Sequence, residues 1–254
     1  PCTAEATGVG MTPVDVTASL IYSNNTNAGA ATANASWAGD TNHTGNTGSG
    51  GFTIGQAAST VTVTCTAGAP FTYTGLAQTP CTAEATGVGM TPVDVTASLI
   101  YSNNTNAGAP TADASWSGDT NHTGNSGSGG FTIGQATSTV TVTCPLALQP
   151  FTGSALTPCT AEATGVGMTP VDVTASLIYS NNTNAGAATA NASWAGDINH
   201  SGNTGSGGFT IGQVTSTVTV TCTAGAPYTY TGSAQTPCTA EATGVGMTPV
   251  DVTA

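Results

Sequence analysis

The sequence predicts an all-β protein in which a small β-sandwich recurs about every 79 residues. Three observations support this prediction. The chain consists of near-identical repeats, its apolar residues alternate with threonines, and clusters of Asn, Gly, Ser and Thr separate the alternating runs. We find no stretch of useful length with helical periodicity.

The repeats are long and almost identical. The segment PCTAEATGVGMTPVDVTASLIYSNNTNAGA begins at Pro1, Pro80 and Pro158, and its first 18 residues return at Pro237. The periods of 79, 78 and 79 residues suit one small β-domain per repeat and exceed the length of a solenoid rung. Because the same residues stand at both ends, we expect the chain to be a section of a longer array.

Each expected strand places apolar residues on one face. In 61–65, two valines share a face with Cys65, and threonines occupy the other face. In 81–86, Cys81 is in phase with two alanines, while Glu84 faces water. The same alternation predicts further strands at 95–102, 31–37 and 52–54.

Glycine and tryptophan add two local expectations. The run Gly48–Gly51 is expected to form a turn before the strand at 52–54. Trp37, Trp116 and Trp194 are in phase with inward alanines, which favours a role as core plugs. The alternative is a platform on which a sugar stacks, and it would require these side chains to face solvent.

The charge balance excludes two classes of partner. The chain has no Lys or Arg and 12 acidic residues, which gives a formal net charge of −12. Such a chain cannot neutralise phosphates, so we expect no nucleic-acid partner. It also lacks the basic patches that hold proteins on anionic lipid, and its longest apolar run is too short for direct membrane insertion.

The cysteines indicate an oxidising compartment. Seven Cys occur without any C-x-x-C spacing, which favours a disulfide framework over zinc binding. We therefore expect an extracellular or cell-surface location.

The motifs VTVTC, FTYTG, TPCTA, YSNNTNAG, ASWAGD and GGFTIGQA resemble those of bacterial immunoglobulin-like repeats of the MBG type. The resemblance covers the whole chain, repeat by repeat. It implies tandem immunoglobulin-like β-sandwich domains in a long secreted or surface protein of a prokaryote. Such repeats serve as stalks, fibres or adhesin arms.

The family resemblance also implies where the domains begin. The strand VTVTC would be the first strand of a domain, so complete domains would span 57–135 and 136–213. Residues 1–56 would form an incomplete repeat without its first strand. Residues 214–254 would hold only the N-terminal strands of another.

This phase implies a disulfide pairing, because it puts two inward-facing cysteines at the start of each domain. The implied pairs are Cys65–Cys81, Cys144–Cys159 and Cys222–Cys238, with Cys2 left unpaired. A rival pairing keeps a constant spacing of 63 residues and joins Cys2–Cys65, Cys81–Cys144 and Cys159–Cys222. That constant spacing supports the rival, because in the first pairing the segment between the two cysteines is one residue shorter in the second copy. A one-residue deletion in a loop, however, need not move the ends of the loop. We predict the first pairing.

One turn is a candidate metal site. Asp40, Asn42 and Thr44 place oxygen atoms at the first, third and fifth positions of a loop with Gly45 at the sixth, like the start of an EF-hand. The twelfth position is Gly51 rather than Glu, so a polar turn with Asx hydrogen bonds is the favoured interpretation. The neighbouring histidines, which have no second ligand nearby, are interpreted as surface loop residues: His43, His122 and His200.

No residue is assigned a catalytic role and no cofactor is expected. Ser, His and Asp lie in repeated turns, and the cysteines are expected to be oxidised and inert. Eight Asn-x-Ser/Thr triplets are possible glycosylation sites, although in a bacterium a by-product of Asn- and Thr-rich turns is favoured. Their asparagines are Asn24, Asn34, Asn42, Asn103, Asn121, Asn181, Asn191 and Asn199.

Two functions remain open at this point. The leading hypothesis is a structural protein that forms a stalk or filament, with contacts between its own repeats as the main interaction. The alternative is a multivalent adhesin whose repeats each bind a glycan, a host surface or a partner protein weakly.

Overall fold

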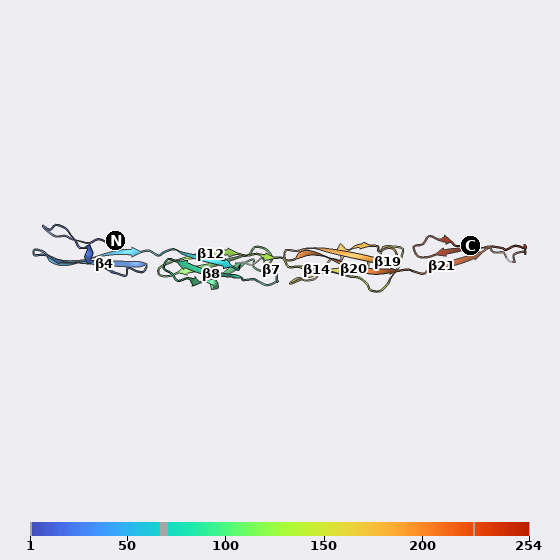
Figure 1. The fold of residues 1–254 in the computed structure, drawn as a ribbon, viewed down its shortest axis with the longest axis horizontal. Coiled ribbons are helices and arrows are strands. Elements are labelled where there is room, and N and C mark those ends of the chain that lie inside the picture. The colour runs from blue at the N-terminus through green and yellow to red at the C-terminus, as the bar shows by residue number, and fades with distance from the viewer. Residues whose placement is uncertain (1, 67–70, 226, 254) are drawn as a thin grey trace. The chain divides into compact units, whose positions relative to one another are not determined.

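The computed structural model describes residues 2–66, 71–225 and 227–253 (Figure 1). These residues form an all-β structure, in which the helical elements are three short 3-10 turns. The ends of the first and last predicted segments, Pro1 and Ala254, lie outside the described residues, as do 67–70 and 226 in the connections.

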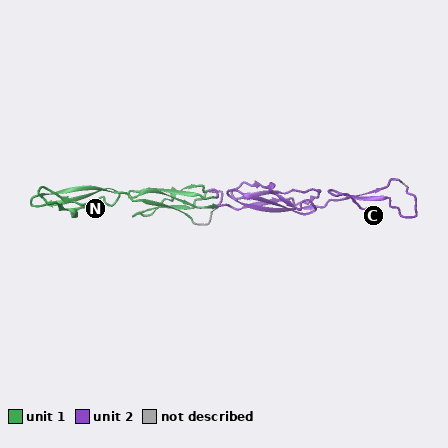
Figure 2. Cartoon of the chain, turned by 90° about the horizontal axis from the view of Figure 1, so that it is seen from above, with its two compact units in different colours: residues 1–71, 77–104, 108–133 green, residues 72–76, 105–107, 134–254 purple. Residues whose placement is uncertain are grey.

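The chain divides into two compact units (Figure 2). Unit 1 contains residues 1–71, 77–104 and 108–133, and unit 2 contains residues 72–76, 105–107 and 134–254. This division is coarser than the four predicted segments. Contacts between neighbouring segments within each unit account for the difference, as shown below.

In the described residues, each sheet takes its strands from one predicted segment. In 1–56 the sheets are β1 (Glu5–Ala6) with β2 (Val14–Asp15), and β3 (Ile21–Ser23), β4 (Gly29–Gly39) and β5 (Thr44–Ile54). In 57–135 they are β6 (Ser59–Cys65), β8 (Cys81–Gly87) and β9 (Val93–Asp94); β10 (Ile100–Ser102), β11 (Thr111–Gly118) and β12 (Thr123–Gly130); and β7 (Phe71–Thr72) with β13 (Ile133–Gly134).

The second half repeats this arrangement. In 136–213 the sheets are β14 (Ser138–Thr143), β16 (Thr160–Gly165) and β17 (Val171–Asp172), and β15 (Gln149–Pro150), β20 (Ser201–Gly212), β19 (Gly186–Gly196) and β18 (Ile178–Ser180). In 214–254 one sheet contains β21 (Thr217–Cys222), β22 (Cys238–Thr243) and β23 (Val250–Asp251).

Small residues form the core between two facing sheets. In 57–135, Val61, Ala83 and Ala85 of the first sheet pack with Ala114 of the second, and Trp116 lies half-buried against them. The predicted alternation of β6 and β8 is confirmed, because their inward residues are buried or half-buried while Thr60, Thr62, Thr64 and Thr82 are exposed. A core of alanine and valine lets the two sheets approach closely.

The Gly-rich run lies inside a strand, so the prediction of a turn at Gly48–Gly51 is wrong. This run belongs to β5, and its counterparts belong to β12 and β20. A Cβ on Gly127 would lie only 2.1 Å from the carbonyl oxygen of Val61, and a Cβ on Gly129 would lie 2.9 Å from Cγ1 of Val63. Glycine is needed in β12 because β6 passes directly over it.

The predicted strand at 95–102 is interrupted. The 3-10 turn η2 (Thr96–Ser98) separates β9 from β10, and η1 (Thr17–Ser19) and η3 (Thr174–Ser176) do the same in their repeats. The Oδ1 atom of Asp94 accepts a hydrogen bond of 2.8 Å from the Thr96 amide, which favours a turn over an extended strand. The expected sidedness holds for Val95, which is buried, and for Ile100, which is exposed, but not for Ala97, which the 3-10 turn leaves exposed.

Among the described residues, no helix has the length and apolar character needed to cross a membrane.

Candidate functional site

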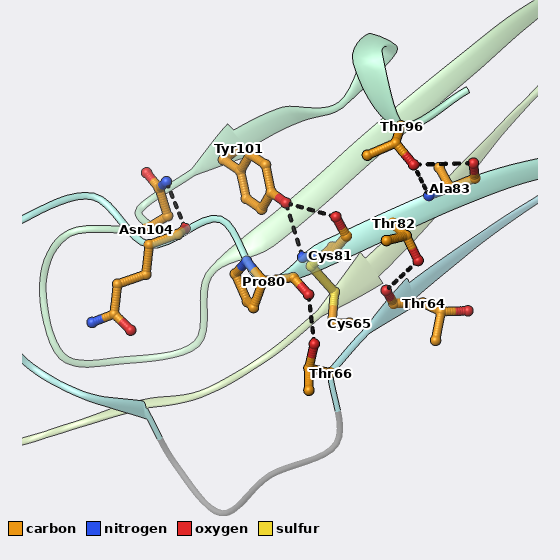
Figure 3. The surroundings of a disulfide bond; sticks show 11 residues. Thr64, Cys65, Thr66, Pro80, Cys81, Thr82, Ala83, Thr96, Tyr101 and Asn104 are labelled. Atoms are coloured by element: carbon orange, nitrogen blue, oxygen red, sulfur yellow. Dashed lines mark hydrogen bonds between the residues drawn. A yellow bond between two sulfur atoms is a disulfide. The ribbon is translucent and has the colours of Figure 1, made fainter. Parts of the chain in front are cut away.

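A disulfide joins the first two strands of each sheet that begins with the VTVTC strand. The structure contains Cys65–Cys81, Cys144–Cys159 and Cys222–Cys238, and Cys2 is a free, half-buried cysteine. Cys65 and Cys81 stand directly opposite each other in the antiparallel pair of β6 and β8 (Figure 3). This is the pairing implied by the family phase, and the described residues contain none of the pairs with a spacing of 63.

Hydrogen bonds hold the backbone around this disulfide (Figure 3). The Tyr101 hydroxyl accepts a bond of 3.0 Å from the Cys81 amide and donates one of 3.3 Å to the Cys81 carbonyl. The Thr66 hydroxyl donates a bond of 2.8 Å to the Pro80 carbonyl. In the third repeat, Tyr179 makes the same two bonds to Cys159.

Peptide mapping under non-reducing conditions should recover these three disulfides. The mapping needs a protease other than trypsin, because the chain offers no Lys or Arg for cleavage. We expect linked peptides that contain Cys144 and Cys159, and a free thiol at Cys2. Peptides that join Cys81 to Cys144 would contradict this connectivity.

The Asp-x-Asn-His turn is a closed hydrogen-bonded loop. The Oδ1 atom of Asp119 accepts bonds from the amides of Asn121 and His122, at 2.7 and 2.8 Å, and lies 2.9 Å from Nδ1 of His122. In the first repeat, the calcium candidate Asp40 uses its Oδ1 in the same way, with three nitrogen partners at 2.8 Å. This Asp40 oxygen therefore accepts hydrogen bonds from its own turn, as expected for a polar turn with Asx hydrogen bonds.

The other two calcium candidates, Asn42 and Thr44, are exposed and follow Asp40 in this turn. Asn42 supplies one of the amides that bond the Asp40 carboxylate. Across residues 2–66, 71–225 and 227–253, no group of three His, Cys, Asp or Glu residues is arranged to hold a metal ion.

The histidines of the second and third repeats are buried, so their interpretation as surface loop residues is wrong. His122 is 6% exposed and His200 is 2% exposed. The Nε2 atom of His122 lies 2.8 Å from the Val88 carbonyl oxygen, while Nδ1 faces Asp119. Both ring nitrogens therefore face acceptors, and only the imidazolium form donates a hydrogen bond from each. The Val88 carbonyl and the Asp119 carboxylate raise the pKa of His122, and this histidine lowers the pKa of Asp119 in turn.

The turn also bonds to the preceding repeat. In unit 1, Oδ1 of Asn121 accepts a bond of 2.8 Å from the Ala28 amide, and its Nδ2 donates one of 3.1 Å to Oδ1 of Asn27. Nε2 of Gln56 donates a bond of 2.7 Å to the Asp119 carbonyl. We call these three bonds the inter-repeat contact.

Unit 2 contains the same inter-repeat contact one repeat later. Asn199 bonds to the Ala107 amide at 2.9 Å and to Asn106 at 3.2 Å, and Gln135 bonds to the Asp197 carbonyl at 2.7 Å. Sequence reasoning missed this contact. The recurrence of Asn, His and Gln at fixed positions in every copy was the available signal.

Stability of the inter-repeat contact should depend on pH. Because the pKa of His122 is raised above its ordinary value of 6.5, the stabilisation is complete below that pH and is lost as pH rises through the folded-state pKa. The lowered pKa of Asp119 has the opposite consequence, and its stabilisation is lost only in acid, below about 3.8. We expect the contact to be strongest in mildly acidic solution.

The measurement is the hydrogen-exchange protection factor of the Ala28 amide, whose acceptor is Asn121. Protection should fall as pH rises above 6.5 and through the raised folded-state pKa of His122. A His122→Gln variant is the control and should remove this pH dependence. An unchanged protection factor in the wild-type chain would contradict the assignment of a charged histidine.

The tryptophans lie against the core. Trp116 packs on the cluster of Val61 and Ala114, and Trp194 packs on the matching cluster of the third repeat. Each indole ring also lies beside a turn histidine, with centroids 6.3 Å apart for Trp116 and His122. These contacts agree with the predicted core role of Trp116 and Trp194, which are half-buried.

The asparagines of the eight Asn-x-Ser/Thr triplets fall into two groups. Asn121 and Asn199 are half-buried, and both ends of their amides are engaged in the inter-repeat contact. A glycan on either would therefore remove that contact. The other six are exposed: Asn24, Asn34, Asn42, Asn103, Asn181 and Asn191.

Comparison with known proteins does not assign the chain to a family. No protein-family model matches the chain, and no curated protein is significantly similar to it.

Proposed function

We propose that the chain is an extracellular structural protein, whose immunoglobulin-like β-sandwich repeats of the MBG type form a stalk or filament on or outside the cell. The observation that carries this proposal is the inter-repeat contact, which recurs with the same residue types in both units. The same asparagine and glutamine positions thus join one repeat to the next in both units. This is what a spacer requires.

The connection between repeats supports the same function. β5 ends at Ile54 and β6 begins at Ser59, so only four residues link the two strands. Within that link, Gln56 bonds to the Asp119 carbonyl and the Ala57 amide bonds to the Asn121 carbonyl at 2.8 Å. A short link whose backbone is hydrogen-bonded restricts the rotation of one repeat against its neighbour.

Covalent and surface chemistry support an extracellular place of action. Disulfides persist in oxidising compartments, and each sheet that begins with a VTVTC-type strand carries one. The outward faces of β6 and β14 carry threonines, which are polar and uncharged. Their low charge suits a spacer better than a surface that must select a charged partner.

The test is the spread of distances between spin labels on neighbouring repeats. A variant with Asn121→Ala and Asn199→Ala loses the inter-repeat contact, and its distance distribution should broaden. The matched control replaces Asn34 and Asn191, which are exposed sequon asparagines on β4 and β19. Equal broadening in both variants would contradict the proposal. Specific binding on a glycan array would favour the adhesin.

A further inference from the structure

The strand pair that carries the disulfide ends differently in the second and third repeats. In the second repeat, β6 and β8 stay paired up to and including their two cysteines. In the third repeat, the pairing of β14 and β16 ends at Thr143 and Thr160, one position before the Cys144–Cys159 disulfide. The disulfide of the third repeat therefore lies beyond the end of its ladder rather than inside it.

Two hydrogen bonds hold the strands on the far side of the disulfide in the second repeat. The Thr66 amide donates a bond of 3.2 Å to the Pro80 carbonyl, and the Thr66 hydroxyl donates one of 2.8 Å to the same oxygen (Figure 3). In 214–254, Thr223 makes the same two bonds to the Pro237 carbonyl, both at 3.0 Å. These bonds join residues of one repeat, so they do not depend on a neighbouring repeat.

Proline removes both of these bonds in the third repeat. Pro145 stands at the position of Thr66, and Pro158 stands at the position of Pro80. Proline has neither a backbone N–H nor a hydroxyl, so a pair of prolines offers no hydrogen-bond donor to either carbonyl. The Cys144–Cys159 disulfide is therefore flanked by hydrogen-bonded strands on one side, whereas Thr66 holds the second repeat on both sides.

Burial does not distinguish the two disulfides. In each repeat a tyrosine hydroxyl accepts a bond of 3.0 Å from the amide of the second cysteine, Cys81 or Cys159. These cysteines are 4% and 3% exposed, respectively. Their partners, Cys65 and Cys144, are both half-buried. The hydrogen bonds that Pro145 removes are thus a difference between otherwise similar surroundings.

We propose that Cys144–Cys159 is a thiol-exchange site, at which a low-molecular-weight thiol opens the third repeat while Cys65–Cys81 stays oxidised. Strands at the end of a ladder separate locally more often than strands inside it, because fewer hydrogen bonds must break. Such an opening gives an external thiolate access to the half-buried Sγ of Cys144. Losing two hydrogen bonds shifts a local equilibrium by about tenfold or more, and the rate of exchange follows it.

The exchange proceeds in two balanced steps. The external thiolate attacks Sγ of Cys144, the Cys144–Cys159 bond breaks, and Cys159 takes the electron pair and then a proton. A mixed disulfide now joins the small thiol to Cys144. A second small thiol attacks the sulfur of the first, which frees Cys144 and releases a disulfide of the two small thiols. The protein disulfide is thus reduced to two thiols while two small thiols are oxidised.

One residue would then decide which repeats of an array respond to a thiol. A threonine at the position of Thr66 gives a repeat whose disulfide is held on both sides. A proline there, as at Pro145, gives a repeat whose disulfide exchanges. Copies that are nearly identical elsewhere would differ in their response.

Time-resolved reduction of the full chain tests the proposal. A Cys2→Ser chain, in which no free cysteine remains among the described residues, is incubated with reduced glutathione. Free thiols are trapped with iodoacetamide and located with a protease other than trypsin. We expect Cys144–Cys159 to open about tenfold faster than Cys65–Cys81, with a glutathione adduct on Cys144 at early times.

The Pro145→Thr variant tests the cause. It restores an amide and a hydroxyl opposite Pro158 and should slow exchange in the third repeat to the rate of the second. Ala147→Thr is the matched control, because it adds the same residue at an exposed position of the same loop, and it should exchange as fast as its parent. The converse variant, Thr66→Pro, should speed exchange in the second repeat.

Equal rates for the two disulfides in the Cys2→Ser chain overturn the proposal. A Pro145→Thr chain that exchanges as fast as its parent also overturns it. If Thr66→Pro prevents the second repeat from folding, the Pro145→Thr result decides alone. None of these results touches the proposed structural function, which the spin-label distances test.

Discussion

Replacing Gly127 with Ala should destabilise the second repeat by about 3 kcal/mol, the upper part of the range for overpacking a closely packed site. The added Cβ would lie 2.1 Å from the Val61 carbonyl oxygen, which belongs to backbone and cannot rotate away. The two sheets would have to separate locally. The same replacement at Gly48 meets no atom within 4 Å and should be neutral or stabilise slightly, by about 0.5 kcal/mol, because alanine restricts the unfolded chain.

Tryptophan fluorescence can report the first three repeats separately, since each of them contains one tryptophan. A background with Trp37→Phe and Trp194→Phe leaves Trp116 to follow the second repeat during urea unfolding. The complementary background leaves Trp37 to follow the first repeat. Equal urea midpoints for Gly127→Ala and its parent chain would show that β6 does not lie against β12 as described.

Removing one disulfide should have an effect of similar size. Cys144 and Cys159 are 15 residues apart, and closing a loop of that length contributes about 3 kcal/mol in the chain-entropy model. A Cys144→Ala, Cys159→Ala variant should therefore unfold the third repeat at a lower urea concentration, with Trp194 as the reporter. Alanine is preferred to serine because Cys159 is 3% exposed, and a buried hydroxyl would add its own cost.

Cys2→Ser is the matched control for this experiment. It removes a cysteine that has no disulfide partner in the described structure, so the midpoint of the third repeat should not change. A double alanine variant as stable as the control would mean that the strand pair of β14 and β16 holds its register without the covalent bond.

Alternation in the sequence was sufficient to predict the strands at 31–37, 61–65 and 81–86, but not the Gly-rich strands β5, β12 and β20. The positions of Val61, Ala83 and Ala85 in the core follow from their period of two, because successive side chains of a strand point to opposite faces. The disulfide connectivity needed more than spacing. It followed from the resemblance to MBG-type repeats, which implied that VTVTC is the first strand of each domain.

Three features were beyond local sequence patterns. Gly48–Gly51 gives the same local signal whether it forms a turn or lets another strand approach closely, and only the position of β6 over β12 decides between them. Burial of His122 likewise depends on the Val88 carbonyl, 34 residues away along the chain. The inter-repeat contact joins Asn121 to Ala28 across 93 residues, a separation that no strand pattern encodes.

The disulfides also set how far a repeat extends when it is pulled from its ends. Cys65 and Cys81 are 16 residues apart, so the segment between them stays closed when the rest of the repeat unravels. At about 3.3 Å per residue, each intact disulfide withholds roughly 50 Å of extension. A reducing environment would therefore lengthen each unravelled repeat that contains a disulfide by that amount, and the oxidation state of these cysteines governs the extensibility of the chain under load.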